Sequence, residues 1–145
     1  MVAGLEGLRI FQLAEELADA VWTEVITWKP FVRDTVGRQL AEAADSVGAN
    51  IAEGHGRFHY REEITFDYYG RGSLRETRYW LRRAHTRRII GNETFQCLMA
   101  KVDQLEPQLN AYIGSLERKA AASKRKGASL IKPPARSPVE CRCVS

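Results

Sequence analysis

Apolar residues recur along the chain at intervals of three and four, the period of an amphipathic α-helix, in four separate segments. These segments cover residues 8–27, 35–52, 60–88 and 93–119. No segment shows the alternation of apolar and polar residues that is typical of a strand. Short connections that contain glycine or proline separate the segments. We therefore predict an all-α protein, an antiparallel up-down-up-down four-helix bundle over residues 1–119.

Each predicted helix has a stripe of residues for a shared core. In the first helix Ala18 and Trp22 widen this stripe, and in the last one Pro107 is expected to kink the helix. The apolar stripe of residues 93–119 and the aromatic residues of the first helix together provide more apolar surface than one small bundle can bury. We therefore expect the protein to associate with copies of itself.

The net charge of +4 is unevenly distributed along the chain. Residues 118–145 contain eight Lys or Arg and one Glu, a net charge of +7, so the remainder carries a net charge of −3. Ala, Ser, Pro, Lys and Arg make up most of residues 120–145, which we predict to be a flexible basic tail. The basic character of the whole chain is therefore a poor argument for nucleic-acid binding by the bundle.

Composition also argues against several classes of protein. No apolar run approaches the roughly 18 residues that cross a bilayer, and no secretion signal is recognisable. Cys97, Cys141 and Cys143 cannot form a disulfide framework, and the last two lack the second ligand pair of a zinc site. We expect a cytoplasmic protein with reduced thiols.

No catalytic set, metal site or cofactor motif is recognisable. There is no arrangement of nucleophile and base, no pair of carboxylates and no phosphate-binding loop. His55 and His59 are four residues apart, but metal binding at this spacing needs a continuous helix. Gly54 and Gly56 are expected to break the helix and leave His55 in a loop. We predict that the protein is not an enzyme and holds neither a metal nor a cofactor.

The third segment carries a row of arginines, the side chain best suited to phosphate because its planar fork donates two hydrogen bonds. Residues 57–88 contain nine Arg and four acidic residues. Four of these arginines, spaced by four, three and four, fall within about 60° of one another around a helix. The alternatives are a solvated face, or pairing with acidic residues of the remaining chain. The candidate contacts to nucleic acid are Arg71, Arg75, Arg78, Arg82, Arg83 and Arg87.

Asn50 is a polar residue on or near the apolar stripe of the second segment. A polar side chain in such a place needs a partner, and Ser46 and Ser73 are candidates by position. A buried asparagine can fix the register of packed helices, so we favour this structural role over a catalytic one.

A set of short motifs carries a family resemblance: Gln39, Asn50-Ile51-Ala52-Glu53-Gly54, Gly56-Arg57 and Ser73-Leu74-Arg75-Glu76. In order and spacing they resemble the four-helix bundle proteins associated with 23S rRNA intervening sequences, and the related accessory variability proteins of diversity-generating retroelements. The resemblance covers residues 8–117. Its structural motif comprises Asn50, Glu53, Gly54, Ser73 and Glu76. Tyr79-Trp80-Leu81 looks more like the retroelement branch.

The resemblance implies a left-handed bundle that assembles as a ring of five protomers and has no catalytic site of its own. In the retroelement branch such a ring binds a reverse transcriptase and its template RNA. Our first hypothesis is therefore a nucleic-acid-binding accessory protein of a reverse transcriptase. The alternatives are a 23S rRNA intervening-sequence protein, or a protein–protein scaffold that binds no nucleic acid.

Overall fold

The computed structural model describes residues 4–127 and 131–133, and its long elements are all helices. The short 3₁₀ turn η1 (Leu5–Gly7) precedes the first long helix, and the helical turn α2 (Pro30–Val32) with the π-helical turn η2 (Arg33–Gly37) precedes the second. The predicted all-α four-helix fold is confirmed. The four long helices are α1 (Arg9–Val25), α3 (Arg38–His55), α4 (Tyr60–Thr86) and α5 (Asn92–Arg125).

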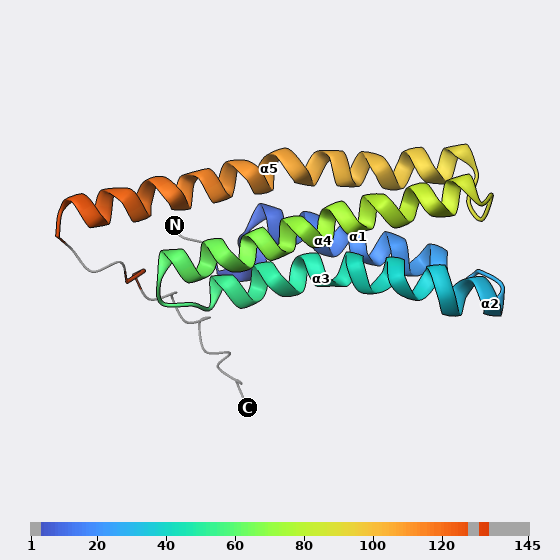
Figure 1. Ribbon diagram of the computed structural model, residues 1–145, viewed down its shortest axis with the longest axis horizontal. Helices are drawn as coiled ribbons and strands as arrows, with labels where there is room; N and C mark the ends of the chain where they lie inside the picture. The colour runs from blue at the N-terminus through green and yellow to red at the C-terminus, as the bar shows by residue number, and fades with distance from the viewer. Residues whose placement is uncertain (1–3, 128–130, 134–145) are drawn as a thin grey trace, which may run out of the picture.

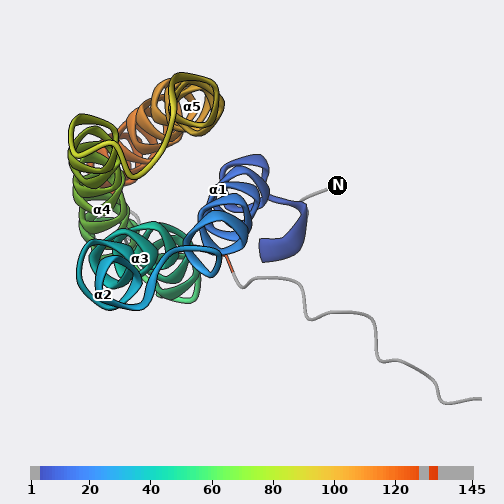
Figure 2. The ribbon, with the colours of Figure 1, turned by 90° about the vertical axis from the view of Figure 1, so that its right-hand side faces the viewer.

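The four long helices run along one axis, as Figure 1 shows. Seen end-on in Figure 2, they occupy four corners in the order α1, α3, α4 and α5, and contacts between α1 and α5 close the bundle. The turn between α4 and α5 lies at the same end as α2, and the turn between α3 and α4 lies at the other end.

The apolar stripes predicted from the sequence form most of the core. Leu17, Val21, Leu40, Val47 and Leu105 have no exposed surface. Trp22 is an exception, because 57% of its surface is exposed although we predicted that it widens the core stripe of the first helix. The stripe is widened instead by Ile10 and Leu13. The remaining large exposed apolar or aromatic side chains are Ile26, Phe31, Phe58, Tyr68, Tyr69, Tyr79 and Ile131.

The C-terminal ends of two helices differ from the prediction. α3 continues through Gly54 and ends at His55, so His55 is helical and not in a loop. α5 continues through Pro107 as one helix in Figure 1 and ends at Arg125, six residues beyond the predicted Lys119. Residues 120–125 of the predicted flexible tail are therefore helical. Residues 128–130 and 134–145 of that tail, which include Cys141 and Cys143, lie outside the described residues.

No helix of the described ranges is both long enough and apolar enough to cross a lipid bilayer.

Candidate nucleic-acid interface

The arginine row on α4 faces α5, and its first two members contact that helix. Arg71 donates a hydrogen bond from Nη1 to Oδ1 of Asn110 at 3.2 Å and lies over the ring of Tyr68. The guanidinium of Arg75 lies 3.8 Å from a carboxylate oxygen of Glu106. Both contacts hold the edge of α4 against α5.

Arg78 makes the strongest of these contacts. Its Nη2 lies 2.9 Å from Oδ1 of Asp103 and 2.7 Å from Oε2 of Glu106. Partial burial disfavours the charged guanidinium, but the two carboxylates outweigh this and raise the pKa of Arg78. Arg78 is therefore committed to an intramolecular ion pair. Pairing with acidic residues, the alternative considered for the row, applies to Arg75 and Arg78.

The other candidate arginines lie nearer the C-terminal end of α4. Arg82 and Arg87 are exposed and Arg83 is half-buried. None of these three forms an ion pair with a side chain in the described part of the chain. Arg82 continues the α5-facing row, whereas Arg83 and Arg87 follow Trp80 by three and seven residues and share its face. The structure thus divides the six candidates between two edges of α4.

A groove between α4 and the α2–η2 turn adjoins Arg87. Phe31, whose surface is 80% exposed, lies on one side of this groove, and Trp80 of α4 lies on the other. Gln39, one of the motif residues, supplies an exposed amide to the same groove. We call this hollow the α2–α4 groove. Its lining residues are Phe31, Val32, Thr35, Val36, Gln39, Trp80, Arg87 and Ile89.

Acidic side chains near this groove are few. Asp34 is paired with Arg33 at 3.1 Å. The carboxylate of Glu76 accepts a 3.4 Å hydrogen bond from the indole N–H of Trp80. The groove therefore combines aromatic faces with a guanidinium group, which suits an unstacked base and its phosphate.

The motif of the family resemblance supports the packing of α3 against α4. Asn50 is half-buried, and its Nδ2 donates a hydrogen bond to the backbone carbonyl of Ser46, one turn earlier in α3, at 2.8 Å. Of the two partners suggested by position, Ser46 is thus the observed one, through its backbone. This bond lies within α3 and therefore does not fix the register of α3 against another helix, contrary to our prediction for Asn50. Glu53 pairs with Arg57 at 2.5 Å on the surface.

The other motif residues lie along α4. Ser73 is half-buried and its carbonyl accepts a 2.8 Å hydrogen bond from the buried hydroxyl of Thr77. Glu76 is exposed beside Trp80, as described above. Gly70 is buried, and a Cβ built there would lie 3.4 Å from the carbonyl oxygen of Val47. Close helix contact explains the glycine at position 70, which lies between the two parts of the motif.

Replacing Gly54 by alanine is expected to destabilise the protein by ~1–3 kcal/mol, because the crossing of α3 and α4 is overpacked by one methyl group. The new Cβ would lie 2.9 Å from Cβ of Phe66 and 3.0 Å from the carbonyl oxygen of Glu63. Gly72→Ala is the matched control, since nothing lies within 4 Å of its Cβ, and a gain of about 1 kcal/mol is expected there. Urea unfolding measures both. Equal effects would contradict the close-packing role of Gly54.

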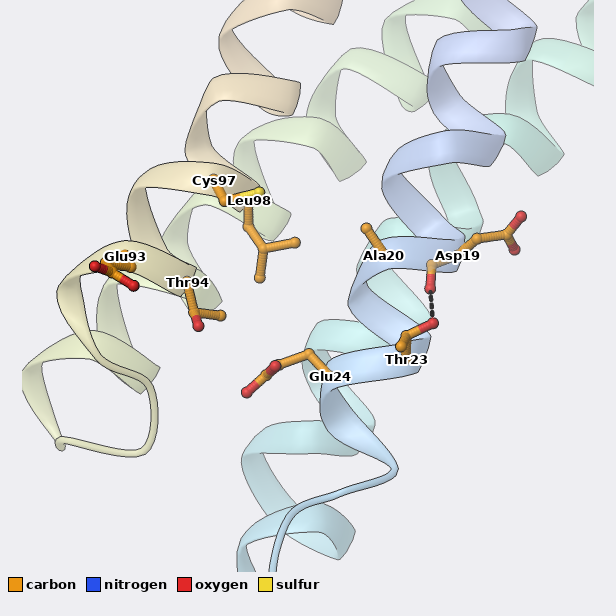
Figure 3. A pocket seen from close by; sticks show the side chains of 8 residues that line it. All are labelled: Asp19, Ala20, Thr23, Glu24, Glu93, Thr94, Cys97 and Leu98. Atoms are coloured by element: carbon orange, nitrogen blue, oxygen red, sulfur yellow. Dashed lines mark hydrogen bonds between the residues drawn. The ribbon is translucent and has the colours of Figure 1, made fainter.

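A second hollow lies between α1 and α5 and is acidic. Figure 3 shows Asp19, Ala20, Thr23 and Glu24 of α1 opposite residues of α5. The α5 side consists of Glu93, Thr94, Cys97 and Leu98. The hydroxyl of Thr23 is bonded to the carbonyl of Asp19 at 2.9 Å. This groove contains three carboxylates and no cation, so it has the opposite charge to the edge of α4 that carries Arg83 and Arg87.

Sequence reasoning missed a buried polar cluster near the turn between α3 and α4. Glu63 and Asp67 of α4 are 1% and 0% exposed. The hydroxyl of Tyr112 donates a 2.7 Å hydrogen bond to Glu63, and Nδ1 of His55 lies 3.8 Å from the same carboxylate. The i, i+4 spacing of Glu63 and Asp67 on the core side of an amphipathic helix was the available signal.

In residues 4–127 and 131–133, no group of three or more His, Cys, Asp or Glu has the geometry to hold a metal ion. His55 and His59 therefore belong to no such group among the described residues, although His55 lies in a helix as metal binding at this spacing would need.

The protein is an α-helical bundle in which α4 carries a row of arginines and adjoins the aromatic α2–α4 groove. The model of the family named 23S rRNA-intervening sequence protein matches residues 6–111, and the chain belongs to this family. The crystal structure of a protein of unknown function from the S23 ribosomal protein family of Bacteroides thetaiotaomicron has a similar fold, with a TM-score of 0.65 and 18% identity. The likeness covers 72% of this chain and 97% of that one. No curated protein matches.

Proposed function

We propose that this protein is a non-catalytic nucleic-acid-binding protein, and that it binds single-stranded RNA at the α2–α4 groove. The observation that carries the proposal is the division of the arginines on α4. Arg71, Arg75 and Arg78 are engaged with α5, whereas Arg83 and Arg87 have no ion-pair partner in the described ranges and share a face with Trp80. Unpaired guanidinium groups beside aromatic faces are the chemistry of single-strand binding.

Membership of the 23S rRNA-intervening sequence family favours an RNA ligand. An RNA strand could place phosphates on Arg83 and Arg87 while a base stacks on Phe31 or Trp80. Gln39 offers an amide for a base edge or a ribose hydroxyl. We place this activity in the cytoplasm, as the sequence predicts.

An accessory role for a reverse transcriptase in a diversity-generating retroelement is the more specific of our hypotheses. The family match supports the rRNA-associated alternative better. The genomic neighbourhood distinguishes the two, since the retroelement role requires an adjacent reverse transcriptase gene and the alternative requires a location inside an rRNA gene.

A homo-oligomer, with five copies as the specific expectation, remains part of the proposal, but its physical basis changes. The apolar stripe of α5 is largely buried within one chain, so exposed side chains such as Trp22 and Ile26 are the apolar surface left over. The acidic α1–α5 groove and the basic edge of α4 are complementary, which favours a head-to-tail contact that closes into a ring.

The expected result in light scattering is a mass that is a multiple of 16.4 kDa and that falls as salt is raised. Charge reversal at Asp19 and Glu93 is expected to lower the mass, whereas the same change at the exposed pair Glu42 and Glu62, outside the groove, is not. A monomer at micromolar concentration in low salt contradicts the oligomer.

The proposed binding is tested with the full chain and a fluorescent single-stranded RNA of mixed sequence. Affinity is expected to fall steeply with salt, with each phosphate contact contributing about 0.7 to the slope of log affinity against log salt. Substituting Arg136 and Arg142 by glutamine separates the contribution of the C-terminal charges while leaving Lys132 in place. Binding that is insensitive to salt, or lost with these tail charges alone, contradicts a site on the bundle and favours the scaffold alternative.

A further inference from the structure

The chain returns after α5 to the turn between α3 and α4, at the opposite end from the α2–α4 groove. Ile131 forms an antiparallel bridge with His59, and the backbone N–H of Lys132 donates a 2.5 Å hydrogen bond to the carbonyl of Phe58. These contacts lay residues 131–133 against the start of α4.

The ammonium group of Lys132 enters a recess with three oxygen acceptors. Its Nζ lies 2.7 Å from Oε2 of Glu63, 2.9 Å from the carbonyl oxygen of His55 and 3.4 Å from that of Gly54. The two carbonyl oxygens accept hydrogen bonds from Nζ, and the contact with Glu63 is an ion pair. The two carbonyls belong to the C-terminal turn of α3, where a positive charge is favoured by the helix dipole, and the carbonyl of Gly54 also accepts the backbone N–H of Arg57.

The recess is built into the fold rather than lying on its surface. The side chain of Glu63 is 1% exposed and that of Lys132 is 12% exposed. One turn further along α4, Asp67 is fully buried, and neither of its carboxylate oxygens has a hydrogen-bond partner among the described residues. Burial raises the pKa of Asp67 to about 8, so Glu63, which forms the ion pair with Lys132, is the carboxylate that faces the ammonium.

We propose that Glu63 and the end of α3, beside the buried Asp67, form a pocket for a primary ammonium group. Lys132 of the same chain is its ligand. The bound lysine anchors the C-terminal segment over the turn between α3 and α4. The proposal does not depend on nucleic-acid binding, and its test uses no RNA.

The other groups that face the pocket favour an ammonium over a larger cation. Tyr112 of α5 occupies the second oxygen of Glu63 with its hydroxyl. His55 approaches the same oxygen from the end of α3 at 3.8 Å. The space left therefore suits a point charge on a thin alkyl stem, whereas a planar guanidinium would need more acceptors in one plane.

The first experiment compares full-length Lys132→Met with Lys126→Met, a matched change of an exposed lysine one residue beyond α5. Methionine keeps the length of the stem and removes the charge. Hydrogen exchange of the amide of residue 132 is expected to accelerate roughly tenfold to a hundredfold in Lys132→Met, the factor expected for loss of a charge-assisted hydrogen bond. Lys126→Met is expected to leave it unchanged. Unchanged exchange in Lys132→Met overturns the proposal.

The dependence on Glu63 is tested in the Glu63→Gln background. There Lys132→Met is expected to add little further acceleration, because the two side chains act as one unit. Fully additive effects overturn the pairing. Exchange of the amides of Leu40 and Leu105, in the core of α3 and α5, reports whether each variant is folded.

Chemical rescue tests the class of ligand. In full-length Lys132→Ala, n-propylammonium chloride is expected to raise the melting temperature relative to equal concentrations of 1-propanol and of sodium chloride. An equal effect of 1-propanol overturns an ammonium pocket. The exchange rate of residue 132 in the unmodified protein is expected to be the same at all protein concentrations. Slower exchange at higher concentration would show that the lysine comes from a second copy.

Discussion

Replacing Arg83 and Arg87 together by glutamate is expected to weaken binding of single-stranded RNA by roughly tenfold to a hundredfold near 0.1 M salt. Two phosphate contacts become two repulsions, so the slope of log affinity against log salt is expected to fall by about 1.4. Neither arginine has an ion-pair partner in the described part of the chain, glutamate is a good helix former at position 83, and Arg87 lies just beyond the end of α4. The bundle is therefore expected to stay folded.

The matched control is the double variant Arg61→Glu with Arg118→Glu. It changes the net charge by the same amount at the other end of the bundle, where both arginines are exposed. Loss of long-range attraction lowers affinity in both double variants, so their difference measures the local contribution of the groove. Equal losses would place RNA binding in the overall charge of the chain rather than at the α2–α4 groove.

Phe31→Ala distinguishes stacking from charge in the same assay. Because 80% of the Phe31 surface is exposed, its removal is expected to leave stability nearly unchanged. A base that stacks on this ring contributes ~1–3 kcal/mol, so affinity is expected to fall while the salt slope stays the same. This signature is absent if Phe31 only contacts another protein.

The sequence predicts the helices and most of the core because burial follows a simple period. Leu17, Leu40 and Leu105 fall on stripes spaced by three and four, and all three are fully buried. Trp22 falls on such a stripe too, yet it is exposed. A stripe that is widened by one position can face either the core or a partner, and periodicity does not distinguish the two.

The candidate site is less predictable, because a charged side chain on a helix edge has no sequence signal for its partner. Arg78 and Arg82 share an edge of α4, but the acidic pair of Arg78 lies on α5, more than 20 residues away. The buried Glu63 reads as an ordinary acidic residue in the first turn of a helix. Its partner Lys132 lies in a segment whose composition predicts no structure.

Replacing Asp67 by asparagine is expected to remove a large pH dependence from the stability of the protein. Burial, and secondly the charge of Glu63, raise the pKa of Asp67 from 3.8 to about 8, while Lys132 opposes this shift. The folded chain therefore holds a proton on Asp67 over a pH range in which the unfolded chain has released it. The free energy of unfolding then falls as the pH rises through this range, by up to ~1.4 kcal/mol per pH unit.

Asparagine resembles the protonated carboxyl group in shape but does not titrate. The free energy of unfolding of Asp67→Asn minus that of the unmodified chain is expected to rise by roughly 2–4 kcal/mol between pH 5 and pH 7.5. Groups that titrate in both chains cancel in this difference, and an unsatisfied amide shifts the curve without changing its slope. Urea unfolding across the range measures it, with the exposed Asp19→Asn as control.

The same titration tests the link between Asp67 and the C-terminal segment. Because the ammonium of Lys132 lowers the pKa of Asp67, the Lys132→Met chain is expected to hold the proton to a higher pH. We compare the free energy of unfolding of the double variant Lys132→Met, Asp67→Asn with that of Lys132→Met alone. The difference between these two free energies should keep rising beyond pH 8 instead of levelling off there. A curve that levels off at the same pH with and without Lys132 would mean that the ammonium does not act on Asp67 in solution.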